Sequence, residues 1–395
     1  MFRLPVLVLG LTALLFPGPF AQDIRARDLG FRVEPVAGPF AFPWSVAWLA
    51  DGTPVVSARD GALWLVRGHR NLQIAGVPRV ATGGQGGLFD VLILAPTGGR
   101  QDLLLSYAWK DVDGRSLRVS RFTLGGNDDS GWRLATGRTL FDLLPRSAGP
   151  IQYGGRLGLL PDGTLLVATG DRGVMARAQD PADGAGKIHR INLDGTVPAD
   201  NPFVDKPGWQ PSIWTLGHRN IQGLWVEPGT GRVWATEHGP MGGDEVNRIL
   251  PGRNYGWPVI TYGVNYGSGT KIGEGFEKTG MEQPILYWKP SIAPSGFIRY
   301  DGDRFPKWKG SFFSGALAGQ GLSRFRISDG PAVASPADRA TIPPHPPAYL
   351  VEEEYLLAGI LGRIRDVRTG PDGLIYLTTD SPQGRLYRLI PPTSP

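Results

Sequence analysis

A strand–turn–strand unit recurs six times along this chain. Each copy places a short apolar run on either side of a tight turn, and the clearest copies turn at Asp-Gly, as at Asp51 and Asp372. Asp-Gly between alternating apolar residues is a strong signal for a β-hairpin. The turns are 47 to 72 residues apart, near Asp51, Gly98, Asp162, Gly229, Asp301 and Asp372. Four short strands with their loops fill such a period, which is typical of a β-propeller blade.

We therefore predict an all-β fold, a six-bladed β-propeller with four-stranded antiparallel blades, as one domain over residues 22–395. The 57 glycines and 36 prolines suit turns and disfavour long helices. Hydrophobic residues, at 41%, exclude a disordered chain. A pair of β-sandwiches is the alternative, but it leaves six copies without a linker unexplained. The last strand, near Leu386, is expected to complete a blade begun at the N-terminal end.

Residues 1–21 are typical of a secretory signal peptide. Their apolar stretch, Leu4 to Phe16, follows Arg3 and is short for a membrane span of roughly 20 residues. We expect cleavage after Ala21, a periplasmic or secreted mature protein, and no membrane span once the signal is removed. A membrane anchor is the alternative.

Composition excludes several classes of function. The chain has no cysteine, which excludes disulfides, thiolate metal sites and a cysteine nucleophile. Its 41 Lys and Arg residues against 36 Asp and Glu give a mild net charge of +5. No basic run of the kind that marks nucleic-acid binding is present, so we expect no nucleic-acid partner.

Several loops are richer in Gly, Asn, Arg and His than turns require. They are residues 82–88, 152–157, 171–173, 216–224, 237–245, 254–258 and 362–367. Each loop taken singly has a plain structural explanation, as a turn or a pair of exposed arginines. On the axis of a propeller, however, these loops from several blades would bring together three arginines, amides and glycine backbone. Such a set suits a flat, anionic, hydrogen-bonding ligand.

These loops carry a resemblance to a known family. The sequence resembles the soluble periplasmic quinoprotein sugar dehydrogenases, the glucose/sorbosone and aldose sugar dehydrogenase group. The resemblance covers nearly the whole mature chain. It rests on the order and spacing of Pro43-Trp-Ser-Val-Ala-Trp48, Gly186-Lys-Ile-His-Arg-Ile-Asn-Leu-Asp-Gly195, Asp200-Asn-Pro-Phe203, Leu216-Gly-His-Arg-Asn220, Glu237-His-Gly-Pro240, Asn254-Tyr-Gly-Trp-Pro258 and Arg363-Ile-Arg-Asp366. Proteins of this group are six-bladed propellers that bind pyrroloquinoline quinone (PQQ) and calcium.

The resemblance implies a cofactor site and two calcium sites. Gln85, Arg219 and Asn220 match residues that contact PQQ, and Arg363 and Arg365 match the pair that holds its carboxylates. The calcium beside the quinone is implied by the carbonyl groups of Gly239 and Pro240. A second, structural calcium is implied by Glu245 and the carbonyl of Tyr255. Oxygen ligands of these kinds suit a hard cation.

Two positions depart from the family pattern. Gln152 stands where the family has the histidine that acts as general base, and Ala318 stands where it has a lysine that contacts the cofactor. A neutral amide cannot titrate near pH 7 as histidine does. Asp171, which orients that histidine in the family, either takes the proton itself or is retained without that role. His218 and His238 lie in the same loops and are the alternative bases.

The resemblance therefore implies a quinoprotein sugar dehydrogenase acting on CH–OH donors, with a site weakened at Gln152. It would oxidise aldose sugars at the anomeric carbon to lactones, with PQQ and calcium, and pass electrons to an external acceptor. One alternative is a catalytically inactive propeller that binds PQQ, calcium or a glycan. A calcium-dependent lactonase is less favoured, because such sites need several carboxylates and amides converging on one calcium.

Overall fold

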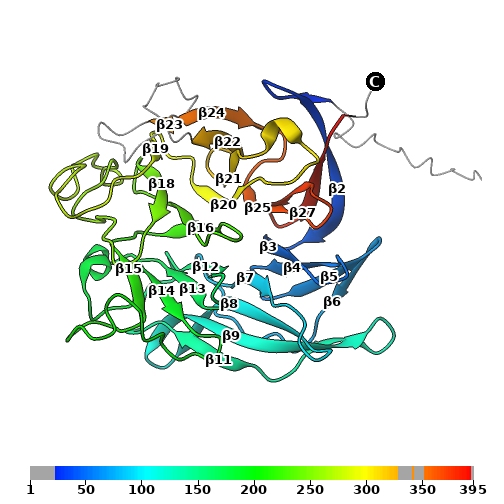
Figure 1. Ribbon diagram of the computed structural model, residues 1–395, viewed down its shortest axis with the longest axis horizontal. Helices are drawn as coiled ribbons and strands as arrows, with labels where there is room; N and C mark the ends of the chain where they lie inside the picture. Colours follow the sequence, from blue (N-terminus) through cyan, green and yellow to red (C-terminus); the bar gives the residue numbers. More distant parts are fainter. Residues whose placement is uncertain (1–22, 328–339, 342–350, 393–395) are drawn as a thin grey trace, which may run out of the picture.

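The structure is a computed structural model that describes residues 23–327, 340–341 and 351–392 (Figure 1). Three of its sheets have four strands. One contains β3 (Pro43–Trp48), β4 (Pro54–Ala58), β5 (Leu63–Arg67) and β6 (Arg70–Gln73). The next contains β12 (Gly154–Leu159), β13 (Leu165–Thr169), β14 (Lys187–Ile191) and β15 (Ile213–Leu216). The third contains β20 (Pro294–Arg299), β21 (Phe312–Ala316), β22 (Gly321–Ile327) and β24 (Val351–Leu356).

The other three sheets carry one strand more. The first contains β7 (Leu88–Ile93), β8 (Gln101–Asp111), β9 (Gly114–Asn127), β10 (Gly131–Leu134) and β11 (Arg138–Asp142). The second contains β16 (Ile221–Val226), β17 (Val233–Glu237), β18 (Asp244–Ile249), β19 (Leu286–Trp288) and β23 (Ala340–Thr341). The last contains β1 (Ile24–Arg25), β2 (Gly30–Phe40), β25 (Ile364–Thr369), β26 (Ile375–Thr379) and β27 (Gly384–Ile390).

The six sheets form a closed ring of blades. The innermost strands contact one another in the order β3, β7, β12, β16, β20 and β25, and β25 returns to β3. Figure 1 shows the blades radiating from this centre. The only helices in the described ranges are two short 3₁₀ turns, Met175–Gln179 and Pro306–Trp308. The predicted six-bladed β-propeller with four-stranded antiparallel blades is confirmed, with an added strand on three of them.

The repeated turns have one structural role. Each of the six predicted turns joins the first strand of a blade to its second, as Asp51 does between β3 and β4 and Asp372 between β25 and β26. The predicted closure is also correct, since β2 pairs antiparallel with β27 and places Ala37 opposite Leu386. One blade is thus built from both ends of the chain.

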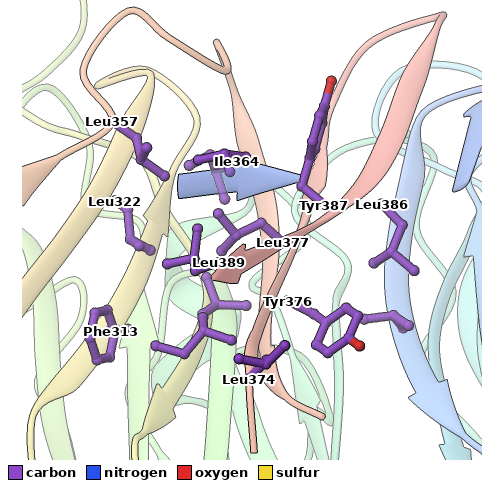
Figure 2. Packing of buried hydrophobic residues seen from close by; sticks show 14 of the residues in the cluster. Phe313, Leu322, Leu357, Ile364, Leu374, Tyr376, Leu377, Leu386, Tyr387 and Leu389 are labelled. Carbon is purple, nitrogen blue, oxygen red and sulfur yellow. The ribbon is translucent and has the colours of Figure 1, made fainter. Parts of the chain in front are cut away.

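Apolar side chains fill the spaces between neighbouring blades. Figure 2 shows Phe313 and Leu322 of the β20 sheet facing Ile364, Leu377 and other residues of the last blade. All four of these side chains are almost fully buried. The alternation of inward and outward side chains along each strand therefore matches the face-to-face packing of the blades.

Two expectations about the membrane stand differently. Within the ranges that the structure describes, no helix combines the length and the apolar character needed to cross a bilayer. The predicted signal peptide, residues 1–21, lies outside the described residues and stays a prediction.

The centre of the ring holds a buried network of charges. Arg156 of β12 is 1% exposed, and its Nη1 lies 2.8 Å from Oδ1 of Asp366 and 3.7 Å from Oδ1 of Asp90. Arg368 pairs with the same two carboxylates at 3.0 and 2.9 Å. Two arginines thus match two aspartates across three innermost strands, and the guanidinium of Arg156 also stacks on Trp44 at 4.0 Å.

We expect Arg156→Met to lower the free energy of unfolding by about 3 kcal/mol, because removing one partner leaves a buried charge uncompensated. Chemical denaturation, followed by tryptophan fluorescence, measures the change. Arg79→Gln, at an exposed position, is the control and should change stability by less than about 0.5 kcal/mol. An unchanged midpoint for Arg156→Met would show that Arg368 alone compensates both aspartates.

Candidate functional site

Two adjoining cavities lie where the innermost strands begin. The first, which we call the large cavity, has a volume of about 1000 Å³, and the second, the arginine cavity, about 260 Å³. They are continuous, because four residues line both: Gln85, Asn220, His238 and Ala293. Three of these four come directly before or soon before an innermost strand, so the ring of blades holds the walls of the site.

Nine of the eleven predicted site residues line these cavities. The large cavity is lined by Gln85, Gln152, Asp171, Arg219, Asn220, Gly239 and Pro240. The arginine cavity is lined by Gln85 and Asn220 again, with Arg363 and Arg365. The remaining two, Glu245 and Tyr255, line neither cavity. The nine residues come from four blades, those with β7, β12, β16 and β25 as innermost strands.

Gln152 is held in an unusual backbone conformation. Its φ is +51°, in the left-handed region, and its N–H donates to Oε1 of Gln85 at 2.7 Å. The glycine at position 170 is required here, since a Cβ there would lie 2.2 Å from the carbonyl oxygen of Gln152. The side-chain Oε1 of Gln152 is buried and has no hydrogen-bond partner among the described residues. The amide thus presents an unused hydrogen-bonding group at the wall of the large cavity.

Asp171 is one of the two carboxylates that line the large cavity, together with Asp244. Its Oδ1 accepts from the N–H of Gly173 and its Oδ2 from the indole N–H of Trp257, both at 2.8 Å. Burial raises the pKa of Asp171 above its ordinary value, although these donors and the Arg219 charge oppose the rise. Each oxygen keeps a free lone pair. The group is therefore both fixed in position and made more basic than an exposed aspartate.

The arginine cavity has more positive than negative charge. Arg363 donates through Nε and Nη2 to Oδ2 of Asp380 at 2.9 and 2.8 Å, and Arg365 lies 3.4 Å from the same oxygen. Burial lowers the pKa of Arg365 to about 10, and its Nε is buried with no partner among the described residues. Two arginines thus share one carboxylate, and an anionic ligand would restore the balance.

Arg219, which precedes β16, contacts the segment that follows β17 in the wall of the large cavity. Its Nη1 donates to the carbonyl oxygens of His238 and Gly239, at 3.0 and 2.6 Å. The Gly239 N–H in turn donates to Oδ1 of Asp244 at 2.9 Å. Burial raises the pKa of Asp244 to about 6. The carbonyl oxygen of Gly239 therefore already accepts a hydrogen bond from a cationic group.

Glu245 and Glu237 form a second acidic centre behind the cavity. They are directly paired on β18 and β17, and the side-chain N–H of Asn247 donates to both carboxylates, at 3.0 and 3.1 Å. Burial and the neighbouring Glu237 raise the pKa of Glu245 well above its ordinary value. The Oδ1 of Asn247 is buried and has no partner among the described residues. Oxygen atoms thus predominate here, and one of them is unused.

The two histidines of the site differ in availability. His218 is fully buried, and its two ring nitrogens contact Thr215 at 2.9 Å and Glu237 at 3.0 Å, so neither is free to take a proton from a ligand. His238 lines both cavities and donates from Nε2 to the carbonyl of Pro294 at 2.7 Å. Burial lowers the pKa of His238 to about 3. It is therefore a neutral and weak base, and His218 is wrong as an alternative base.

Some site residues were not predicted from the sequence. Arg59 and Trp44 line the arginine cavity, and Trp257 holds Asp171. Asp380 pairs with Arg363 and Arg365. Arg59 lies in an Arg-Asp-Gly turn, whose hairpin signal conceals it, and Asp380 directly follows a buried strand. Arg59 and Asp380 both come directly after the second strand of a blade, β4 and β26, and this shared position was the signal that could have found them.

Comparisons with known proteins find similar chains and folds. A family model described as Glucose / Sorbosone dehydrogenase matches residues 40–388. The aldose sugar dehydrogenase YliI of Escherichia coli is 35% identical over 376 residues, which cover 94% of this chain and 96% of that protein. The crystal structure of soluble aldose sugar dehydrogenase from Escherichia coli in the apo-form has a TM-score of 0.82 and 34% identity, and covers 92% of this chain and 100% of that chain.

A structure with a bound cofactor is also similar. The PQQ-bound form of aldose sugar dehydrogenase from Streptomyces coelicolor has a TM-score of 0.71 and 26% identity, and covers 91% of this chain and 97% of that chain. The family model spans most of the chain, and the Escherichia coli relative matches nearly its whole length. The chain therefore belongs to the glucose/sorbosone dehydrogenase family.

Proposed function

We propose that this protein is a PQQ- and calcium-dependent sugar dehydrogenase that oxidises aldoses at the anomeric carbon to lactones. The observation that carries the proposal is the joint cavity. It places the arginines of the arginine cavity and the carboxylate Asp171 of the large cavity around one continuous space. Relatives named as aldose sugar dehydrogenases support sugar oxidation, and one of them is described as PQQ-bound. The predicted leader supports a periplasmic or secreted location.

The arginine cavity fits a flat polycarboxylate. Arg363 and Arg365 would hold carboxylates of PQQ, because a guanidinium matches a carboxylate in bidentate geometry. The unpartnered Nε of Arg365 and the single counter-charge of Asp380 favour an added anion. Trp44, Phe89 and Tyr153 line the same space and supply aromatic walls. Gln85 and Asn220 would contribute amide groups where the two cavities meet.

We propose that calcium binds at two places through oxygen ligands. Gly239 and Pro240 line the large cavity, and the carbonyl of Gly239 already attracts the Arg219 guanidinium at 2.6 Å. Glu245, the unused Oδ1 of Asn247 and the backbone of Tyr255 would hold a second calcium that stabilises the fold. Carboxylate, amide and carbonyl oxygens are the ligands that calcium prefers.

The chain's own residues would position the sugar and take its proton. When bound, PQQ with calcium beside it would supply the acceptor for the hydride that leaves the anomeric carbon. Asp171 would receive the hydroxyl proton on a free lone pair of its carboxylate, which Trp257 and Gly173 hold in place. Gln152 would orient the hydroxyl through its amide, since it has no titratable group. Electrons would then pass to an external acceptor.

Reconstitution tests the proposal. The protein is mixed with PQQ and calcium, and reduction of an artificial dye is followed with several aldoses. PQQ binding is titrated in parallel by absorbance. We expect saturable PQQ binding and aldose-dependent dye reduction. No PQQ binding by the full protein would overturn the proposal.

A second function is favoured by one observation. Gln152 replaces a titratable base with a neutral amide, so a propeller that binds PQQ, calcium or a glycan without turnover is the alternative. Tight PQQ binding without dye reduction for all aldoses would select this alternative over the dehydrogenase.

Calcium should stabilise the protein through Glu245. A ligand that binds only the folded state adds about 2.7 kcal/mol at a concentration 100 times its dissociation constant. We expect calcium to raise the thermal midpoint of the wild type, and Glu245→Gln to lose most of that rise because an amide lacks the charge that holds the ion. Differential scanning calorimetry with calcium or with chelator measures it. The exposed variant Asp372→Asn serves as a control, and an equal rise in Glu245→Gln would remove Glu245 from the site.

A further inference from the structure

We propose that Arg59 is a third anion-binding residue of the arginine cavity, which makes this cavity selective for a flat aromatic ligand with several carboxylates. The inference rests on the proposed function, because PQQ is the ligand of that chemistry. It adds a residue in the loop that follows β4, on the blade next to that of Arg363 in the ring.

The charge of the arginine cavity is unbalanced. Three arginines line it, Arg59, Arg363 and Arg365. Asp380 pairs with Arg363 at 2.8 Å and lies 3.4 Å from Arg365. The structure records no ion pair between Arg59 and a carboxylate of the described residues, so one acidic group faces three guanidinium groups. A ligand with two or more carboxylates would balance this charge.

Arg59 is held in place at its backbone and at its guanidinium group. Its N–H donates to the carbonyl of Phe42 at 3.0 Å, and its carbonyl accepts from the N–H of Leu88 at 3.3 Å. The guanidinium lies 4.5 Å from the centre of the Phe42 ring. These contacts fix both ends of the residue, so the positive group is positioned before a ligand arrives.

A glycine makes room for Arg59. Gly87 has a φ of +153°, and a Cβ at this position would lie 2.0 Å from the carbonyl oxygen and 2.5 Å from the Cγ of Arg59. A side chain at position 87 would therefore displace Arg59 from its place. The loop before β7 and the loop after β4 are thus fitted to each other around this arginine.

The arginine cavity has aromatic walls. Trp44, Phe89 and Tyr153 line the cavity beside the arginines, and Phe89 lies between the other two rings, with ring centres 5.5 Å from Trp44 and 5.4 Å from Tyr153. A cavity of about 260 Å³ with aromatic walls suits a planar ring system better than a flexible aliphatic acid. Charge and shape thus indicate the same class of ligand.

Titration of PQQ by absorbance, in calcium buffer, tests the assignment through binding rather than turnover. We expect Arg59→Gln to weaken PQQ binding by about 10- to 100-fold, because a charge-assisted contact is lost. Arg59→Lys keeps the charge but loses the bidentate fork, so its PQQ affinity should lie between those of the wild type and Arg59→Gln. Arg79→Gln, which removes one charge at an exposed position, is the matched control and should bind as the wild type does.

A flat tricarboxylate without a quinone provides a second readout. Benzene-1,2,4-tricarboxylate should displace PQQ from the wild type at lower concentration than from Arg59→Gln. Should Arg59→Gln fail to fold, Arg59→Lys carries the test alone. If the wild type binds PQQ and the folded Arg59 variants bind it with the same affinity, this inference alone is overturned. Absence of PQQ binding by the wild type overturns the proposed function itself.

Discussion

A Gln152→His variant, loaded with PQQ and calcium, should oxidise aldoses about 10²- to 10⁴-fold faster than the wild type, the usual contribution of a general base. The imidazole would stand in the wall of the large cavity beside Asp171. Histidine is among the residues that tolerate a positive φ, and the value here is +51°. The backbone N–H that binds Gln85 at 2.7 Å is unaffected by the side chain. The measurement is kcat/KM with an artificial dye.

Two controls give this result its meaning. Gln152→Leu has no titratable group and should show no gain. PQQ affinity, titrated by absorbance, should stay the same in Gln152→His, so that the gain is assigned to the chemical step. A variant that binds PQQ as tightly as the wild type and gains nothing would show that loss of the base does not limit the site.

Asp171→Asn should lower the activity of the wild-type protein by about 10²- to 10⁴-fold, if the carboxylate takes the proton from the sugar hydroxyl. Burial raises the pKa of Asp171, so the carboxylate is protonated, and activity lost, as the pH falls through that raised pKa. The acid side of the pH profile should therefore disappear from the residual activity of Asp171→Asn. Steady-state rates from acid to neutral pH measure both effects.

The control for this variant must separate chemistry from structure. Asn at position 171 keeps one acceptor for the two donors Trp257 and Gly173, so a modest fall of the thermal midpoint is expected. Asp372→Asn changes the same residue type in a turn far along the chain and should retain full activity. Retained activity in Asp171→Asn, with an unchanged acid limb, would assign the proton to another group.

The two substitutions should also depend on each other. In Gln152→His the imidazole would take over as base and Asp171 would orient it, so Asp171→Asn should cost less in that background than a second independent loss would. A double-mutant cycle on kcat/KM measures this coupling. Strictly additive effects would mean that residues 152 and 171 do not act on the same proton.

Much of the fold could be predicted because its signals are local. Asp-Gly turns at Asp51, Asp162 and Asp372 lie between the first and second strands of their blades, where a few neighbouring residues determine the geometry. The added outer strands β11 and β23 have no such signal, since β11 pairs with β9 past the intervening β10 and β23 pairs with β19, which lies far from it in the sequence. Their pairing could be seen only in three dimensions.

The site divides in the same way. Gln85, Arg219 and Arg365 belong to motifs in the sequence and do line the cavities. The low pKa of His238 could not be predicted, because it follows from burial and from the charges of nearby arginines, Arg219 first among them, which only the fold places around the ring. The role of Arg59 likewise follows from its neighbours Phe42 and Gly87, which only the closed ring places around it.

The pairing of β2 with β27 has a consequence for the order of assembly. Arg59 and Gln85 are made early, whereas Arg363 and Arg365 are made near the end of the chain, and all four line one cavity. A nascent chain therefore has no complete anion site until its last blade has been synthesised and has paired with β2. A cofactor held by all four residues would also hold the two ends of the chain together, and would resist opening of the ring at its one non-covalent seam.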